Sequence, residues 1–520
     1  MADELDHEEP VGKHITYWPA FLIVFFGLLS LYFLQYGGLT IIRPIIDFSW
    51  AIGAINVLLY IWLRVISGLS AKTQCQFAVG LIVVQCLALI CFRLDGFDGT
   101  GRFIAKWRWS PTPEQQLEQY GSEPVRSSTI SLGAATPFDS PAFRGANRDG
   151  AFQFPNSVNF STCSFKEIWR RPVGRGWSSY AAVGNYCFTQ EQIGDSEAVS
   201  CYRISTSELI WQQKRNVRFD EITSGSGPRA TPAFADGKVV CFGATGWLQC
   251  LDAMNGKLIW EKCFCSNPKD GVLFGFSGSP LIINELIYLT VGAPNESLVA
   301  IELNTGRVAW SMDQRKAGYS SPHPFQHEVG ISILVFDAVG LHAYDAINGQ
   351  HQWSFDWGDN SDEQVNVCQP VVIDSNRILI SSGYGRGSAM LQIEKSADRW
   401  RAVPIWKSKR LRSKFSSIVI KDGYAFGLDE GILTCIELTS GRRVWKSGRY
   451  GHGQLLLSGN VIFVQAEKGE LVLVEASPER FRELRRVEAL SDRTWNYPVL
   501  VREHLLIRND REAVCFQVGQ

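Results

Sequence analysis

The chain has 520 residues, of which 45% are hydrophobic and 20% charged, and its formal net charge at pH 7 is −1. This balance is typical of a globular protein, and without a basic excess it gives no support to nucleic-acid binding. The charged residues are unevenly spread, because long apolar runs fill much of the first hundred residues.

A polar N-terminus, residues 1–16, precedes three apolar runs. Residues 17–42 carry no charge and are long enough, at about 1.5 Å per residue, to cross the hydrocarbon core of a membrane. Residues 48–63 are marginal in length, and residues 73–92 are again uncharged. Residues 17–96 therefore predict three transmembrane helices, with two as the alternative. The acidic start "MADELDHEEP" argues against a cleaved signal peptide in place of the first helix.

Three crossings place the N-terminus and the rest of the chain on opposite sides of the membrane. If the C-terminal part is outside, the basic residues left inside are Lys13, Arg64 and Lys72. The outside segments then carry Arg43, Arg93, Arg102, Lys106 and Arg108. This count mildly favours the reverse orientation.

A linker is predicted over residues 97–140. Its stretch "AKWRWSPTPEQQLEQYGSEPVRSSTISLGAATPF" is rich in Pro, Ser, Gln and Glu and has no sustained hydrophobic period. Such a composition is typical of a tether or a partly ordered segment.

A repeat begins after the linker. The stretches "CLDAMNGKLIWEK", "AIELNTGRVAWSM", "AYDAINGQHQWSF" and "CIELTSGRRVWKS" share one layout, with a turn glycine four residues before a tryptophan. Alternating hydrophobic and polar residues flank each turn, which predicts a hairpin, and two more short strands precede it. Four strands recurring roughly every 40 to 50 residues predict the blades of a β-propeller, in which one blade buries its faces against the next.

Eight inner-strand starts predict eight blades over residues 141–520: "GWSSY", "PRATP", "FSGSP", "GYSSP", "NVCQP", "KFSSI", "GHGQL" and "TWNYP". The last unit has only three strands before the chain ends, whereas Trp169 precedes the first start. Residues near Trp169 are therefore expected to supply the fourth strand of the last blade, which removes free strand edges. The recurring tryptophans are interpreted as packing between blades.

Thirteen cysteines do not predict a disulfide framework. Cys201, Cys250, Cys435 and Cys515 take the same third-strand position in four units, where a small hydrophobic side chain fits. Cys263 and Cys265 are two residues apart, so their side chains point to opposite faces of a strand.

The repeat resembles the tryptophan-docking repeat of pyrroloquinoline-quinone (PQQ) propellers, the fold of quinoprotein alcohol dehydrogenases and of the lipoprotein that assists outer-membrane barrel assembly. The stretches "FRGANRDG", "GWSSYAAVGNYCFTQEQ", "FGATGWLQCLDA" and "LDEGILTCIELTSGRRVWKSGRYGHGQLLL" look more closely like membrane-anchored PQQ-binding-like β-propeller proteins of planctomycete-type bacteria. The resemblance covers roughly residues 140–520. It implies a multi-pass bacterial inner-membrane protein with a periplasmic propeller.

The chemistry of the dehydrogenases is not expected here. In that family a vicinal cysteine disulfide covers the quinone, and carboxylates and amides hold Ca²⁺ beside an aspartate base. This chain has no adjacent cysteine pair, and no carboxylate cluster in it matches such a calcium site. Neither PQQ nor calcium is expected, and no metal site is predicted.

The candidate site is one mouth of the propeller channel, because loops entering inner strands share a face with the turns between second and third strands. The inner-strand starts contribute Trp177, Ser178, Arg229, Ser277, Tyr319, Ser320, Gln369, Lys414, His452, Gln454, Trp495 and Asn496. The turns contribute Gln190, Glu191, Gln192, Tyr384, Asp429, Glu430 and Glu467, and the glycine-rich stretch "GRYGHGQ" adds Arg449.

Mixed charges, amides and aromatics at this mouth predict a binding or scaffold module for a protein, peptide or polar ligand. The alternative is an enzyme, a quinoprotein-like oxidoreductase or a lyase that uses His452, Arg229 and Glu191. No nucleophile elbow, zinc-type spacing or phosphate-binding loop supports a specific reaction, so the catalytic residues are unknown. An exposed apolar or aromatic patch around Trp177 and Trp495 would favour the binding module, and complete burial of both rings would count against it. His452 beside a carboxylate would favour the enzyme.

Overall fold

The computed structural model describes residues 56–61, 69–121, 129–154, 163–265, 272–293, 296–312, 315, 318–357, 366–396 and 399–519. These residues form two compact units, Met1–Ser110 and Pro111–Gln520. The second unit therefore begins within the predicted linker, and it contains the whole repeat region.

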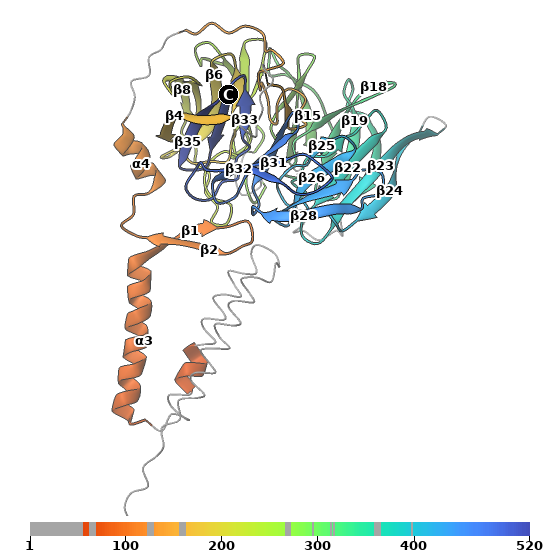
Figure 1. Cartoon of the computed structure of the whole chain (residues 1–520). Coiled ribbons are helices and arrows are strands. Elements are labelled where there is room, and N and C mark those ends of the chain that lie inside the picture. The colour runs from red at the N-terminus through yellow and green to blue at the C-terminus, as the bar shows by residue number, and fades with distance from the viewer. Residues whose placement is uncertain are drawn as a thin grey trace, which may run out of the picture. The chain divides into compact units, whose positions relative to one another are not determined.

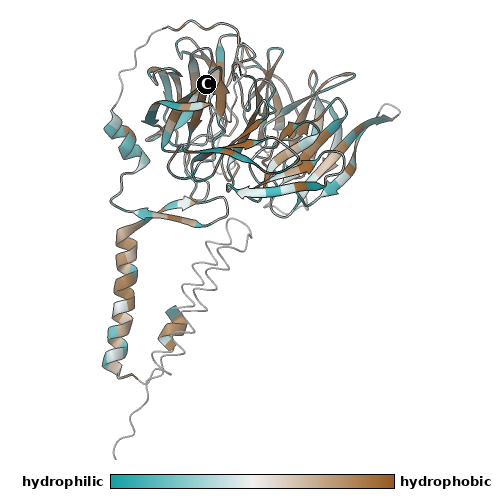
Figure 2. Ribbon diagram, viewed as in Figure 1, coloured by the Kyte–Doolittle hydropathy of each residue, from teal (hydrophilic) through white to brown (hydrophobic). Residues whose placement is uncertain are grey.

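In the first unit, helix α3 (Ala71–Cys91) begins at Ser70, whose hydroxyl accepts a hydrogen bond from the Thr73 N–H. α3 is long and apolar enough to cross a membrane, and Figure 2 colours most of it as hydrophobic. Strands β1 (Phe92–Phe97) and β2 (Phe103–Trp107) form an antiparallel pair after it. The third predicted crossing thus coincides with a helix. The first run and most of the second lie outside the described residues, so the number of crossings stays a prediction.

The second unit is an eight-bladed β-propeller, as the repeat predicts. Each blade is an antiparallel sheet, and the blades are numbered here from the first inner strand. Figure 1 labels many of the propeller's strands. Blades 1 to 3 are β5 (Ala181–Val183), β6 (Tyr186–Ile193), β7 (Ser196–Arg203) and β8 (Leu209–Arg215); β9 (Ala233–Ala235), β10 (Lys238–Phe242), β11 (Trp247–Asp252) and β12 (Leu258–Cys263); and β13 (Leu281–Ile283), β14 (Leu286–Ala293), β15 (Glu296–Glu302) and β16 (Val308–Met312). Blades 4 to 6 are β17 (His323–His327), β18 (Gly330–Phe336), β19 (Gly340–Asp345) and β20 (His351–Asp356); β21 (Val371–Val372), β22 (Arg377–Ser382), β23 (Gly387–Ser396) and β24 (Arg399–Ser408); and β25 (Val419–Lys421), β26 (Tyr424–Asp429), β27 (Ile432–Glu437) and β28 (Arg443–Arg449).

Blades 7 and 8 join the two ends of the propeller. Blade 7 is β29 (Gln454–Ser458), β30 (Val461–Gln465), β31 (Glu470–Glu475) and β32 (Glu483–Glu488), and β3 (Ala151–Phe152) adds to its inner edge in parallel. Blade 8 is β33 (Val499–Val501), β34 (His504–Arg508), β35 (Glu512–Gly519) and β4 (Ser164–Pro172), with Cys515 opposite Trp169. The predicted closure by residues near Trp169 is confirmed.

The tryptophans pack between blades, and the glycines show how. Gly256 of blade 2 lies under the Trp211 ring of blade 1, and the Trp211 indole N–H donates to the Ala253 carbonyl at 3.0 Å. The same arrangement recurs for Gly306 under Trp260 and Gly441 under Trp406. The glycine has a positive φ, and its missing side chain leaves room for the ring of the preceding blade. The repeat motif is thus a joint between two blades.

The predicted linker contains short ordered elements. Helix α4 (Pro113–Tyr120) has a capping box, in which Thr112 and Gln115 each bond the other's backbone N–H. The guanidinium of Arg171, at the outer strand of blade 8, lies 5.3 Å from the ring of Tyr120. Of the two alternatives, a tether or a partly ordered segment, α4 agrees with the second, because its cap and its contact with the propeller order it.

A second unexpected element is the plug segment, residues 136–152. It runs past the β5–β6 and β33–β34 turns, at the end of the propeller opposite the predicted mouth. Its backbone bonds Ala182 of blade 1, Phe234 of blade 2 and Arg502 of blade 8. Its side chains reach blades 3 and 6, since Arg148 donates to the Pro280 carbonyl and Arg144 to the Ile418 carbonyl. The stretch "FRGANRDG" therefore packs against the blades of the propeller, although it precedes the first blade in the sequence.

Candidate functional site

Seven half-buried aromatic residues occupy loops and turns on the face where the chain enters each inner strand. Trp177, Tyr319, Tyr384 and Trp495 were predicted there, whereas sequence reasoning missed three others. The repeat does mark Phe415, which takes in "KFSSI" the position of the tryptophan in "GWSSY" and "TWNYP", but it marks neither Phe219 nor Phe274. The seven are Trp177, Phe219, Phe274, Tyr319, Tyr384, Phe415 and Trp495. We call this set the aromatic rim.

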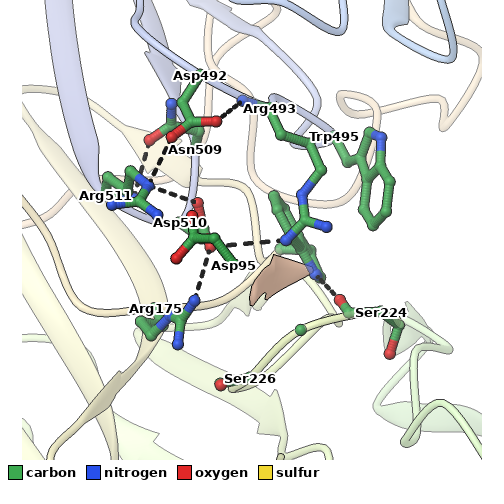
Figure 3. Close-up of polar contacts among 12 residues, drawn as sticks. Asp95, Arg175, Ser224, Ser226, Asp492, Arg493, Trp495, Asn509, Asp510 and Arg511 are labelled. Carbon is green, nitrogen blue, oxygen red and sulfur yellow. Dashed lines mark hydrogen bonds and ion pairs between the residues drawn. The ribbon is translucent and has the colours of Figure 1, made fainter. Parts of the chain in front are cut away.

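Two members of the aromatic rim, Trp177 and Trp495, contact each other, and both contact the guanidinium of Arg493. Their ring centroids lie 4.8 Å apart. The Arg493 guanidinium carbon is 4.8 Å from the Trp177 ring and 4.4 Å from the Trp495 ring. Figure 3 shows Arg493 extended beside Trp495. Because a buried cation on an aromatic face is stabilised by the ring's charge distribution, this arrangement fixes both tryptophans.

Ion pairs connect Arg493 to helix α4 (Figure 3 draws most of these residues). Arg493 lies 3.9 Å from an Asp510 oxygen, and Arg175 lies 3.5 Å from the same oxygen. Arg175 also lies 3.6 Å from Glu114 of α4. The side chain of Asp510 is 5% exposed, so water screens these charges less than it would at a free surface.

Four residues between blades 7, 8 and 1 form the floor beside this pair. Glu467 accepts the Trp495 indole N–H at 2.9 Å and the backbone N–H of His452 at 3.0 Å. The Gln454 amide nitrogen donates to the carbonyls of Phe415 and Trp495, which leaves its buried oxygen unpartnered. Asn496 likewise donates to the Ser178 carbonyl at 2.8 Å, and its buried oxygen has no partner. The floor therefore contains two buried hydrogen-bond acceptors without a donor.

His452 has the wrong environment for a general base. Its side chain is 2% exposed, its ring lies 5.1 Å from Phe415, and Nδ1 has no partner. Burial, together with the nearby charge of Lys414, lowers the pKa of His452 to about 3. Glu467 accepts the backbone N–H of His452. The geometry that would favour an enzyme is thus not found at His452.

Arg229 lies at the aromatic rim, with its guanidinium 4.4 Å from the Phe219 ring. It donates to the carbonyls of Gly225 and Gly227 and to the Ser224 hydroxyl. Burial lowers the pKa of Arg229 to about 10, and the charges of Glu221 and Glu197 oppose that shift. Arg229 therefore stays charged and shapes the loop that carries Ser224.

Glu197 of strand β7, close enough to Arg229 to feel its charge, has a buried carboxyl group. Its side chain accepts the Ala244 N–H at 3.0 Å. Burial raises the pKa of Glu197 to about 7, while the hydrogen bond from Ala244 and the charge of Arg229 act in the opposite direction.

Other predicted site residues lie elsewhere. Gln190, Glu191 and Gln192 are inside strand β6, not in the turn that follows it. Glu191 is fully buried, and it accepts the Gly174 N–H and the Tyr202 hydroxyl, both at 2.7 Å. The Gln190 amide bonds the Ala230 carbonyl at 2.7 Å. These side chains hold blades together, because β6 continues through the three positions that were expected in the turn.

Three further predicted residues lie in blade 6, where they do not form a common site. Asp429 is 1% exposed and forms ion pairs with Arg412 and Lys446. Glu430 is exposed in the β26–β27 turn. Arg449 is exposed at the end of the outer strand β28, away from the inner strands.

The remaining predicted residues lie near the aromatic rim without forming one cluster. Ser277 donates to the Tyr319 carbonyl at 2.9 Å, and the Tyr319 hydroxyl accepts the Phe274 N–H. Lys414 lies 4.8 Å from the Tyr384 ring. Gln369 and Ser320 are buried at inner-strand starts. The predicted residues that the structure does bring together are Trp177, His452, Gln454, Glu467, Trp495 and Asn496.

Between α4 and blade 1 lies a cavity of about 260 Å³. Charges of both signs and apolar groups line it, among them Glu114, Leu117, Glu118, Arg171, Gln192 and Lys214. In the described part of the chain, no group of three or more His, Cys, Asp or Glu side chains is placed to hold a metal ion.

Comparison with known proteins agrees with the fold. Residues 166–447 match the profile of the family PQQ_2, described as outer membrane protein assembly factor BamB. A stretch of 126 residues is 27% identical to the outer membrane protein assembly factor BamB of Moranella endobia, and the match spans 24% of this chain and 29% of that protein.

Solved structures show the same architecture at low identity. BamB from Moraxella catarrhalis is 15% identical with a TM-score of 0.51, over 68% of this chain and all of that one. The quinohemoprotein alcohol dehydrogenase from Comamonas testosteroni is 12% identical with a TM-score of 0.56, over 74% and 81% of the two chains. A europium-containing methanol dehydrogenase is 12% identical with a TM-score of 0.54, over 72% and 90%. At these identities the likeness concerns the fold alone.

Proposed function

Because the chain belongs to the PQQ_2 family of outer membrane protein assembly factor BamB, we propose that its propeller is a protein-interaction module that binds a polypeptide at the aromatic rim. The observation that carries this proposal is the half-buried pair Trp177 and Trp495, which contact each other and the guanidinium of Arg493. Tryptophan and arginine in such positions are typical of the residues that dominate the binding energy of protein interfaces.

The floor of the site favours an extended polypeptide over a compact apolar ligand. The oxygens of Gln454 and Asn496 need donors, and a peptide backbone or an amide side chain supplies them. The rings of Trp177, Phe415 and Trp495 offer apolar faces beside these oxygens. A partner segment that alternates apolar side chains with free N–H groups matches both features.

The apolar helix α3 supports the proposal that the chain is anchored in a membrane. The resemblance to membrane-anchored propellers favours a propeller outside the cytoplasm. The family's name further suggests that the partners are proteins of outer-membrane assembly.

To test the proposed function, the purified full chain is titrated with an unfolded outer-membrane β-barrel polypeptide diluted from urea, and binding is followed by fluorescence anisotropy of the labelled polypeptide. Saturable binding is expected, and Trp495→Ala should weaken it at least tenfold, because truncating a central tryptophan removes its stacking and apolar contact. Trp400→Ala is the matched control, since Trp400 is half-buried on β24 beside His327 and away from the aromatic rim. Equal affinity of the Trp495 and Trp400 variants would contradict the proposed site.

For the alternative function, a quinoprotein-like oxidoreductase, the described residues include no set that fits PQQ and Ca²⁺. The chain has no adjacent cysteines, and no metal-ligating group occurs among the described residues. We propose that the protein acts without PQQ or calcium. A dose-dependent rise of the unfolding temperature with PQQ and Ca²⁺ would overturn this part.

A further inference from the structure

The plug segment brings two arginines into the interior of the propeller. Arg144 and Arg148 are 4% and 2% exposed. Arg148 donates to the carbonyls of Pro280 at 2.9 Å and Ser279 at 3.1 Å, both at the start of blade 3. Arg144 donates to the carbonyl of Ile418 in blade 6 at 2.7 Å and to two carbonyls of the plug segment itself. Both guanidiniums are thus enclosed on the inner side of the ring.

These two charges have no acidic partner. Among the described residues neither guanidinium forms an ion pair, and the partners that they do have are neutral carbonyls and two aromatic rings, those of Phe143 and Tyr497. A guanidinium does not give up its proton at neutral pH, so both stay charged. Carbonyl dipoles satisfy individual N–H groups, but they carry no net charge. Two like charges buried without a counter-charge destabilise the folded state, because each loses its hydration and repels the other.

The positive charge of the two arginines also affects a neighbouring histidine, whose pKa it lowers. His323, the first residue of β17 in blade 4, is 4% exposed. Burial and then the charges of Arg148 and Arg144 lower its pKa to about 3. No carboxylate contributes to the shift at Arg148 or at His323. The electrostatic field around Arg144, Arg148 and His323 is therefore positive.

Three buried nitrogen atoms here lack hydrogen-bond partners: Nε of Arg144, Nε of Arg148 and Nδ1 of His323. Each arginine Nε carries a proton that can only be donated, and a neutral imidazole can donate from Nδ1. Most buried polar groups in proteins are paired, so this concentration of unpaired nitrogen atoms points to a missing acceptor.

We propose that the plug segment and blades 3 to 6 form an anion-binding site in the channel, in which Arg144, Arg148 and His323 hold a small inorganic anion or a carboxylate. The anion supplies the counter-charge that the described residues do not, and it accepts the unpaired N–H groups. It also ties the plug segment to the ring from inside. This site is distinct from the aromatic rim, so it does not depend on the proposed partner binding.

The test measures thermal unfolding of the full chain against concentration of sodium bromide, phosphate, sulfate or acetate, and each curve is compared with that of an arginine variant at the same ionic strength. Binding to the native state raises the unfolding temperature along a saturating curve. Exclusion of a salt from the protein surface instead gives an increase that does not saturate. The four salts separate halide, inorganic oxyanion and carboxylate as the source of the ligand.

Two variants locate the effect. Arg148→Met removes one charge at similar length, and we expect the saturating component to disappear. Arg449→Met removes an exposed charge at the end of β28 and should leave it unchanged. A saturating component that persists in Arg148→Met, or its absence from the native protein with all four salts, would overturn the site.

A crystal of the native protein grown in bromide gives a reading that does not depend on whether Arg148→Met folds. An anomalous peak within hydrogen-bond distance of Arg144 Nε or Arg148 Nε is expected. Bromide bound only elsewhere would contradict the proposal.

Discussion

A protein carrying Gly256→Ala is expected to lose about 3 kcal/mol or more of its free energy of unfolding, a large share for a change of one methyl group. Gly256 has φ of +72°, where an alanine costs about 1–2 kcal/mol. An added Cβ would also lie 2.6 Å from the Trp211 ring. The ring must therefore move, and it is 3% exposed and bonded to Ala253, so its packing and its hydrogen bond weaken together.

Gly237 of the same blade provides the control. Its φ is +71°, but a Cβ there would meet nothing within 4 Å. Gly237→Ala should therefore cost only the backbone strain, about 1–2 kcal/mol. Urea unfolding followed by circular dichroism measures both variants. Equal losses would show that the contact between Gly256 and Trp211 is not what joins blades 1 and 2.

The second large effect is acid sensitivity from His452. Its pKa is about 3 in the folded protein, against an ordinary value of 6.5, so below pH 6.5 the unfolded chain binds a proton that the folded protein does not. The stability contributed by neutral His452 is complete above pH 6.5 and is lost as the pH falls from 6.5 to 3. The expected loss is about 1.4 kcal/mol for each pH unit.

His452→Gln removes the titrating imidazole and keeps a polar side chain of similar length. The difference in unfolding free energy between the native protein and the variant should stay constant above pH 7 and fall steadily between pH 6 and pH 4. Taking the difference cancels other titrating groups, including Glu197, whose raised pKa of about 7 gives a change of opposite sign between pH 4.5 and 7. A difference that does not vary with pH would mean that the pKa of His452 is the same in the folded and the unfolded protein, which would contradict the prediction.

Strand number and blade architecture were predictable from local pattern alone. The alternation around Gly256 and Trp260 specifies a hairpin, and its recurrence specifies a ring. Pairing of residues near Trp169 with the last blade was predictable too, because an unfinished blade leaves free edges that need a partner. What the pattern did not show is that the glycine of one blade accommodates the tryptophan of the preceding blade, which depends on how neighbouring blades pack.

The candidate site was predictable only in part. Trp177, His452, Gln454, Trp495 and Asn496 begin inner strands, and strands that radiate from one axis bring such residues together. Their roles were decided by the tertiary structure.

His452 is buried and neutral because Phe415 and the neighbouring blades exclude water. Glu191 is interior because β6 extends past it. The plug arginines gave no signal in the sequence, because exposure and the absence of a counter-charge are properties of the space around a side chain, which a linear pattern does not contain.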